Sequence, residues 1–188
     1  MRKISIWLAV LLLCLCGCSK SEKGNYNIVE QNKNYEVYAY SKGDAPLSDF
    51  VYIVFNRNGE KIDSKYLELG EPRFKELEDS ILKVGYGTGT NSEIVTYYDL
   101  ANSLISKEYQ NVCYDDGEKV AYITYGDGDT FICVSETFGN EPILKEVLNM
   151  GGIMTTEFKV DIKDGKITVE HAQGKDYKTI VESFDLKI

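Results

Sequence analysis

The side chains best suited to nucleophilic or metal chemistry are scarce in this chain, which has one histidine, His171, and five cysteines. A Ser–His or Cys–His pair requires the histidine beside the nucleophile, and zinc sites need several such ligands. His171 follows Thr168-Val169-Glu170 and opens the polar stretch HAQGKD. This pattern predicts an exposed histidine in a turn at the end of a strand. We therefore expect neither a catalytic residue nor a metal site.

Cys113 and Cys133 lie twenty positions apart, and their pairing depends on the strands that carry them. Turn-forming residues at 115–117 and 126–129 predict a three-strand meander over residues 111–135. The cysteines would then lie on its first and third strands, about 9.6 Å apart at ~4.8 Å per strand. A disulfide needs Cα atoms within about 7 Å. Two alternatives stay open: a disulfide, if the middle strand is not inserted, or two buried thiols that pack as small apolar groups.

Gly85, Gly87 and Gly89 alternate with larger residues in a stretch that could be compared with a phosphate-binding loop. A dinucleotide fingerprint would need another glycine at position 90, where Thr90 stands, and a helix after it. No lysine of a P-loop follows. The stretch is therefore expected to be a flexible loop or a bulge between strands, and no cofactor is expected.

The acidic residues Asp115, Asp116, Asp127 and Asp129 occupy successive turns. Calcium takes six to eight oxygen ligands at about 2.3–2.6 Å. Two turns at opposite ends of one strand cannot combine their carboxylates around one ion. We interpret these residues as turn formers.

The N-terminal segment has the composition of a secretory leader: a basic start, an apolar run over Ile4–Cys16, and an abruptly polar sequel. The run ends in Leu15-Cys16-Gly17-Cys18, which resembles the lipobox of bacterial lipoproteins. The resemblance implies that residues 1–17 are a signal peptide and that Cys18 is alkylated with diacylglycerol and often acylated, for instance with palmitate. Lipid would then anchor the chain in the cell envelope, on the periplasmic or extracellular face. The apolar run has thirteen residues, fewer than the ~20 of a transmembrane helix.

Charge and length constrain the remainder of the chain. Removal of residues 1–17 takes away Arg2 and Lys3 and changes the net charge from −9 to −11. Such a surface repels the phosphates of nucleic acid and permits a cationic partner. We expect residues 18–33 to form the lipidated cysteine and a polar tether of roughly 20 Å, followed by a single domain over residues 34–188.

Short apolar runs separated by Gly, Asn and Asp predict an all-β domain, an antiparallel meander that forms a sandwich or a bent sheet. The hairpin over residues 95–109 is similar to one from a propeller blade. Helical spacing of apolar residues in 72–84 and 141–150 predicts up to two short helices, although residues 80–86 also fit a strand. The predicted strands cover residues 35–40, 50–55, 61–67, 94–98, 104–109, 111–114, 119–124, 130–135, 158–162, 167–170 and 177–186.

These observations favour a membrane-tethered, non-enzymatic domain that binds an unknown protein or small molecule. An alternative is an inhibitor or immunity-type protein that caps a cationic enzyme of the envelope. Residues 112–134 weakly resemble a strand pair of lipoprotein lysozyme inhibitors, with a cysteine beside an acidic turn. A hydrolase of wall polymer is a further alternative, for which no pair of carboxylates is singled out.

Overall fold

The computed structural model describes residues 26–40, 49–68, 70–77, 80–89, 92–153 and 157–186. The predicted signal peptide, residues 1–17, and the predicted lipidation site, Cys18, lie outside these residues. The described chain forms sixteen strands in four antiparallel sheets, which confirms the predicted all-β meander. Among the described segments, no helix has the length and apolar character needed to cross a membrane.

The first two sheets cover the N-terminal half of the chain. The strands of the first sheet are β1 (Tyr26–Gln31), β2 (Tyr35–Tyr40), β3 (Asp49–Phe55) and β4 (Lys61–Leu67). Those of the second are β5 (Arg73–Glu76), β6 (Ile81–Gly89), β7 (Ser92–Asp99), β8 (Leu104–Ile105) and β9 (Tyr109–Gln110).

The other two sheets cover the C-terminal half of the chain. The strands of the third sheet are β10 (Val112–Asp115), β11 (Lys119–Gly126), β12 (Asp129–Glu136) and β13 (Leu144–Leu148). Those of the fourth are β14 (Phe158–Lys163), β15 (Lys166–Gln173) and β16 (Lys178–Asp185).

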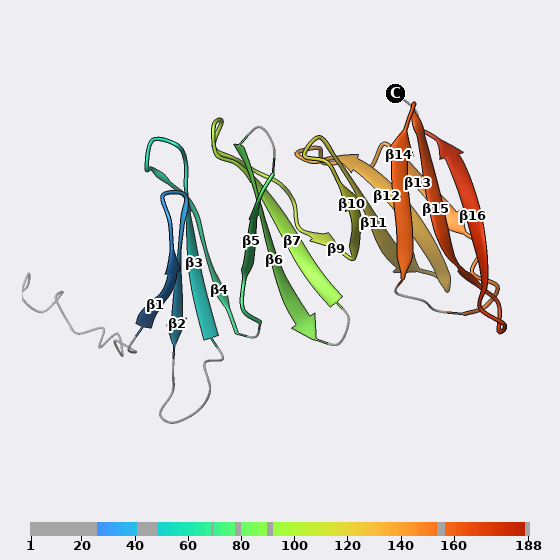
Figure 1. Ribbon diagram of the computed structural model, residues 1–188, viewed down its shortest axis with the longest axis horizontal. Helices are drawn as coiled ribbons and strands as arrows, with labels where there is room; N and C mark the ends of the chain where they lie inside the picture. The colour runs from blue at the N-terminus through green and yellow to red at the C-terminus, as the bar shows by residue number, and fades with distance from the viewer. Residues whose placement is uncertain are drawn as a thin grey trace, which may run out of the picture.

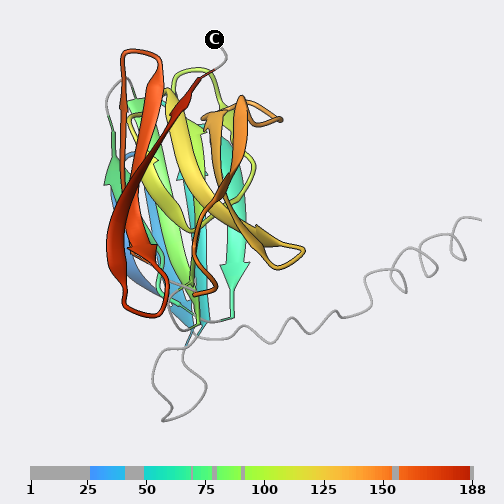
Figure 2. The same ribbon diagram turned by 90° about the vertical axis from the view of Figure 1, so that its right-hand side faces the viewer.

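The four sheets are stacked face to face in chain order along the long axis of the molecule (Figure 1). Seen along this axis, the sheets lie one behind another (Figure 2). Each apolar core cluster lies between two neighbouring sheets. The arrangement is therefore an open row of sheets, in which the first and fourth sheets each have one face that no other sheet of the described residues covers.

The two inner sheets are buried on both faces because their strands carry apolar side chains at consecutive positions, which point alternately to opposite faces. In β7, Val95 and Tyr97 pack against the third sheet, whereas Tyr98 packs against the first. In β11, Val120 faces the second sheet and Ala121 faces the fourth. Successive residues of these strands therefore alternate between the two cores that lie on either side of the sheet.

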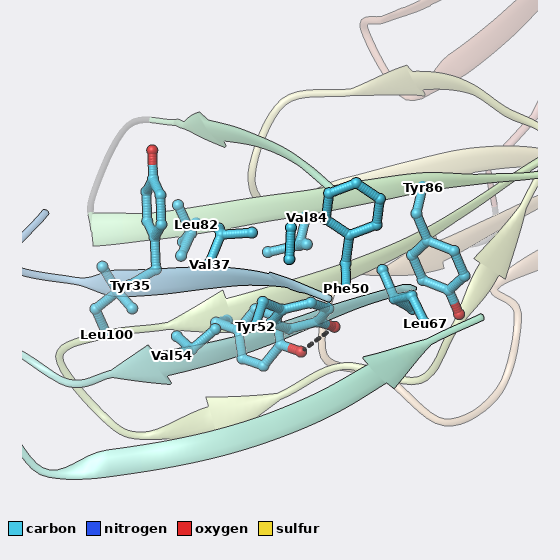
Figure 3. Close-up of a cluster of buried hydrophobic side chains, with 12 residues drawn as sticks. Tyr35, Val37, Phe50, Tyr52, Val54, Leu67, Leu82, Val84, Tyr86 and Leu100 are labelled. Atoms are coloured by element: carbon cyan, nitrogen blue, oxygen red, sulfur yellow. Dashed lines mark hydrogen bonds between the residues drawn. The ribbon is translucent and has the colours of Figure 1, made fainter. Parts of the chain in front are cut away.

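The core between the first and second sheets is rich in tyrosine. The Tyr52 hydroxyl donates to the Tyr98 hydroxyl at 2.9 Å, which in turn donates to the Asp63 carboxylate at 2.7 Å. These two consecutive hydrogen bonds give each of the buried tyrosine hydroxyls a partner. The surrounding cluster, shown in Figure 3, includes Tyr35, Val37, Phe50, Val54, Leu67, Leu82, Val84, Tyr86 and Leu100.

The predicted helices in 72–84 and 141–150 are wrong, since these stretches contain β5, the start of β6, and β13, whereas the alternative of a strand at residues 80–86 is confirmed by β6. In β13, Leu144 and Leu148 are buried and Val147 is exposed, an alternation that fits a strand. The edge of β12 supplies backbone partners that a helix would leave unpaired, as in the bond from Ile143 N–H to the Val134 carbonyl at 2.7 Å. Pairing with a neighbouring strand therefore overrides the local spacing of apolar residues.

Two further boundaries differ from the prediction. The predicted tether, residues 18–33, contains β1, because Tyr26–Gln31 pairs with β2 along the edge of the first sheet. The predicted strand over residues 104–109 is divided into β8 and β9. Between them the Ser106 hydroxyl accepts a hydrogen bond from Tyr97 N–H at 2.9 Å, so a side chain replaces a ladder carbonyl there.

Candidate functional site

A groove of about 620 Å³ opens where the β11–β12 turn approaches the chain that leaves β13. This volume falls in the range of small-molecule sites, about 300–1,000 Å³. The described lining residues are Tyr125, Gly126, Gly128, Asp129, Thr130, Val147, Leu148, Asn149, Met150, Gly151, Gly152 and Ile153.

One wall of the groove is a two-residue hairpin turn. Gly126 pairs with Asp129, and the two residues between them, Asp127 and Gly128, have φ of 52° and 86°. Positive φ at both central positions is the type I′ geometry that suits the twist of a hairpin. Tyr125 stands beside this turn, has 45% of its surface exposed and lines the groove.

The opposite wall is the loop over residues 149–153, which is held against the fourth sheet. Gly174 N–H donates to the Met150 carbonyl at 3.0 Å, and the Gln173 side-chain amide donates to the Asn149 carbonyl at 3.0 Å. At Gly151, with φ of 60°, a Cβ atom would lie 2.8 Å from Gly174 N. Only glycine therefore allows the loop to approach the β15–β16 turn this closely.

His171 is linked to the same loop through Glu182, and the prediction of an exposed turn histidine is wrong. The residue lies within β15, is 2% exposed, and its Nε2 is 2.7 Å from Glu182 Oε1. Its Nδ1 is 3.0 Å from the Ala172 carbonyl oxygen. Glu182 Oε1 also accepts from Asn149 N–H at 2.9 Å. The histidine thus connects two strands of the fourth sheet to the groove wall.

This geometry assigns His171 a structural role in the groove wall. Both ring nitrogens face acceptors, the Ala172 carbonyl and the Glu182 carboxylate. Neither of these contacts goes to a hydroxyl of the described residues, which is the partner that a general base would need.

Among the described lining residues of the groove, Asp129 alone carries a charge. The other polar groups are the Tyr125 hydroxyl, the Thr130 hydroxyl, the Asn149 amide and glycine backbone. Burial raises the pKa of Tyr125 above its ordinary value, so this hydroxyl stays protonated and can donate at neutral pH. The groove is therefore suited to hydrogen bonding and aromatic stacking with an uncharged or weakly cationic ligand.

Of the four acidic residues predicted as turn formers, Asp116 and Asp127 lie in turns, whereas Asp115 and Asp129 are end residues of β10 and β12. Asp116 Oδ1 accepts from the Glu118 and Lys119 amides at 2.9 and 2.7 Å, which closes its turn. Asp115 forms an ion pair with Lys83, and their side chains are only 10% and 20% exposed. The described residues contain no group of three or more metal-ligating side chains.

The glycine-rich stretch is part of a strand. Gly85, Gly87 and Gly89 lie in β6 and pair with β7, with a register shift between Gly87 and Gly89 that marks a bulge. A Cβ atom at Gly85 would lie 2.4 Å from the Glu93 carboxylate. The bulge agrees with one of the predicted alternatives, whereas the flexible loop is wrong.

Cys113 and Cys133 are not bonded to each other in this structure, an arrangement that fits the alternative of two buried thiols. β11 lies between their strands, as expected from the meander. They also lie on opposite faces of the third sheet, since Cys113 packs in the core toward the fourth sheet and Cys133 in the core toward the second. The sheet itself therefore separates the two sulfur atoms.

Iodoacetamide at pH 8 is expected to leave both cysteines unmodified in the folded protein. Burial raises the pKa of Cys113 to about 12, which leaves a thiolate fraction on the order of 10⁻⁴. Cys133 is 3% exposed and out of reach of the reagent. The extent of alkylation at each cysteine is measured by mass-spectrometric peptide mapping, on the folded protein and again after unfolding without reductant. A disulfide would keep both cysteines unmodified after unfolding, whereas free thiols become alkylated.

The comparisons with known proteins give little support for any assignment. No family model and no curated protein matches the chain. One similar solved structure is described as the polysaccharide lyase Uly1, at 14% identity and a TM-score of 0.36. The match covers 81% of this chain and 43% of that one, so the chain spans less than half of the lyase. A likeness this distant carries no argument about function.

The sequence interpretation missed the groove. The helix predicted over residues 141–150 includes Asn149 and Met150, and no helix or strand was predicted for residues 151–153, so no wall was expected there. The adjacent glycines Gly151 and Gly152, directly after an apolar run, were the available signal. Asp129 was placed correctly at the predicted turn over residues 126–129, but the approach of this turn to residues 149–153 depends on contacts between distant segments.

Proposed function

We propose that this chain is a lipoprotein of the bacterial cell envelope, whose β domain is anchored through lipid on Cys18 and binds a partner at the groove without catalysing a reaction. The observation that carries the proposal is the lipobox-like sequence Leu15-Cys16-Gly17-Cys18 behind a basic and apolar leader. The groove supplies a concave site of suitable size on the exported domain.

Binding is favoured over hydrolysis by the chemistry of the groove. Hydrolysis of a glycan generally uses two carboxyl groups on either side of the bond, and the described lining offers Asp129 alone. The alternative of a lysozyme inhibitor gains no support from residues 112–134. There the acidic residue nearest the cysteine, Asp115, is paired with Lys83 and largely buried, so it is not presented to a cationic enzyme.

Photo-crosslinking in intact cells tests both parts of the proposal. With photoreactive benzoylphenylalanine in place of Tyr125, the anchored chain is expected to form an adduct with its partner. The same amino acid in place of Tyr177, which is 67% exposed and does not line the groove, serves as the matched control. The variant Cys18→Ser is expected to lose lipid and to leave the membrane fraction, as measured by labelling with a palmitate analogue.

The outcomes separate the two parts. Adducts of equal yield from positions 125 and 177 would argue against the groove as the binding site. Retention of the palmitate label in Cys18→Ser would overturn the proposed anchor.

A further inference from the structure

The outer face of the first sheet is apolar although no described element packs on it. We use this name for the side chains that point away from the second sheet. Most of them are apolar or aromatic, namely Tyr26, Ile28, Tyr38, Tyr40, Val51, Ile53, Phe55 and Tyr66, and the polar members are Gln31, Glu36, Asp49 and Ser64. Tyr26, Ile28 and Tyr66 have 48%, 55% and 51% of their surface exposed. The first sheet lies at one end of the row of sheets (Figure 1).

Strand register makes this face continuous. Ile28 pairs with Tyr38, Tyr38 with Val51, and Val51 with Tyr66, so one apolar row crosses all four strands. In the adjacent row Tyr26 pairs with Tyr40, and their ring centroids are 5.4 Å apart. A contiguous apolar face of this kind marks an interaction surface.

The free face of the fourth sheet at the opposite end of the row has a different composition. The outward residues of β14 are Lys159, Asp161 and Lys163, and all three are exposed. Next to them, Lys159 forms an ion pair with Glu170 of β15 at 2.8 Å. A polar outer face is the ordinary way to end a stack of sheets in water. The outer face of the first sheet is not polar in this way, so we expect another molecule or surface to cover it.

The short chain distance between this face and the proposed lipid anchor indicates that the bilayer is what covers the face. β1 begins at Tyr26, itself part of the outer face, and only seven residues separate Tyr26 from Cys18. Eight links reach at most about 28 Å when extended and average about 16 Å as a coil. Four strands at ~4.8 Å spacing extend over a similar distance. The whole outer face therefore lies within reach of the bilayer that holds the lipid.

We propose that the outer face of the first sheet rests on the headgroup region of that bilayer, an inference that depends on the proposed lipidation of Cys18. Tyrosine is enriched at this depth because its ring is apolar and its hydroxyl is polar. The acidic side chains on the face are engaged by these hydroxyls: Tyr66 donates to Asp49 at 2.8 Å, and Tyr38 donates to Glu36. The contact is apolar and interfacial, with no attraction to anionic lipid required.

Single tryptophans test this contact, because the sole tryptophan, Trp7, lies in the leader and is removed with it. The mature lipidated chain is reconstituted in phosphatidylcholine vesicles that carry a spin label near the headgroup. Tyr66→Trp and Ile28→Trp are expected to lose most of their emission and to shift to shorter wavelength. Asn27→Trp is the matched control, since it is one residue from Ile28 but on the other face of β1. Tyr177→Trp reports on the opposite end of the row.

Equal quenching of Ile28→Trp and Asn27→Trp would show proximity to the anchor without a docked face, and would overturn the inference. A shift to shorter wavelength without quenching by the spin label, dependent on protein concentration, would assign the face to a second copy of the chain and also overturn it. Mass spectrometry of the Cys18 peptide on the same samples separates this failure from that of the proposed function. Unmodified Cys18 contradicts both proposals, whereas lipidated Cys18 without quenching contradicts only the docked face.

Discussion

Between pH 8 and pH 11 the free energy of unfolding is expected to fall by about 4 kcal/mol because of three buried tyrosines. Tyr52, Tyr97 and Tyr98 have no exposed surface. Burial raises the pKa of Tyr52 to about 12, and it raises those of Tyr97 and Tyr98 further, with the charge of Asp115 added for Tyr97 and the neighbouring Tyr52 for Tyr98.

The sign follows from which state ionises first. In the unfolded chain these tyrosines lose their protons near pH 10, whereas the folded chain keeps them protonated. The contribution of these tyrosines to the free energy of unfolding is therefore fully present below pH 10 and is lost as the pH rises above it. Each tyrosine contributes about 1.4 kcal/mol at pH 11 by linkage. For a domain of ordinary stability, about 5–15 kcal/mol, the three together are a large fraction.

Urea unfolding at pH 8 and pH 11 measures the effect, and two variants control it. Tyr97→Phe should cost little at pH 8, because the buried Tyr97 hydroxyl makes no hydrogen bond of ordinary geometry among the described groups, although Asp115 lies near enough to raise its pKa. It should reduce the loss at pH 11 by the contribution of one tyrosine, about 1.4 kcal/mol. Leu82→Ala should lower stability by about 2–5 kcal/mol at both pH values, because it removes apolar contacts and no ionisable group. Stability that stays constant from pH 8 to pH 11 would contradict the assignment.

The sequence predicts the strands where the period of two and the turn chemistry agree. The β11–β12 hairpin was expected because Gly126-Asp127-Gly128-Asp129 separates two apolar runs, and the register confirms it. The helix expected at 141–150 shows the limit of this approach. Leu144 and Leu148 satisfy both helical spacing and a strand, and only the open edge of β12 decides between them. That edge is a property of the assembled sheet.

Neither the candidate groove nor the burial of His171 could be predicted from the sequence, because both depend on contacts between distant segments. The stretch HAQGKD is polar, yet His171 faces inward from β15 and Gln173 bonds to the Asn149 carbonyl. A polar residue in a polar stretch gives no sign that a loop twenty residues earlier will cover it. The partner of His171, Glu182, lies on a third segment, so the sequence pattern does not show this pair.

Replacement of His171 by alanine is expected to lower the free energy of unfolding by about 3 kcal/mol. The imidazole is buried against Phe158, with ring centroids 6.1 Å apart, and bonds to Glu182. Its removal leaves a cavity and deprives a carboxylate, 23% exposed, of its closest partner. Because Glu182 also binds Asn149 N–H, the groove wall should loosen with it. Hydrogen exchange at residues 149–153 should therefore accelerate more than exchange in the first sheet.

Glu182→Gln separates the charge from the hydrogen bonds in this network. A carboxamide oxygen can still accept from His171 and from Asn149 N–H, so the variant should cost about 1 kcal/mol and leave exchange in the groove wall nearly unchanged. Denaturant titration and hydrogen-exchange mass spectrometry measure the two quantities on the same samples. If His171→Ala destabilised the fold without changing exchange at residues 149–153, the histidine would be a packing residue alone. If Glu182→Gln were as damaging as His171→Ala, the charge of Glu182 would be the essential feature, because the hydrogen bonds remain in that variant.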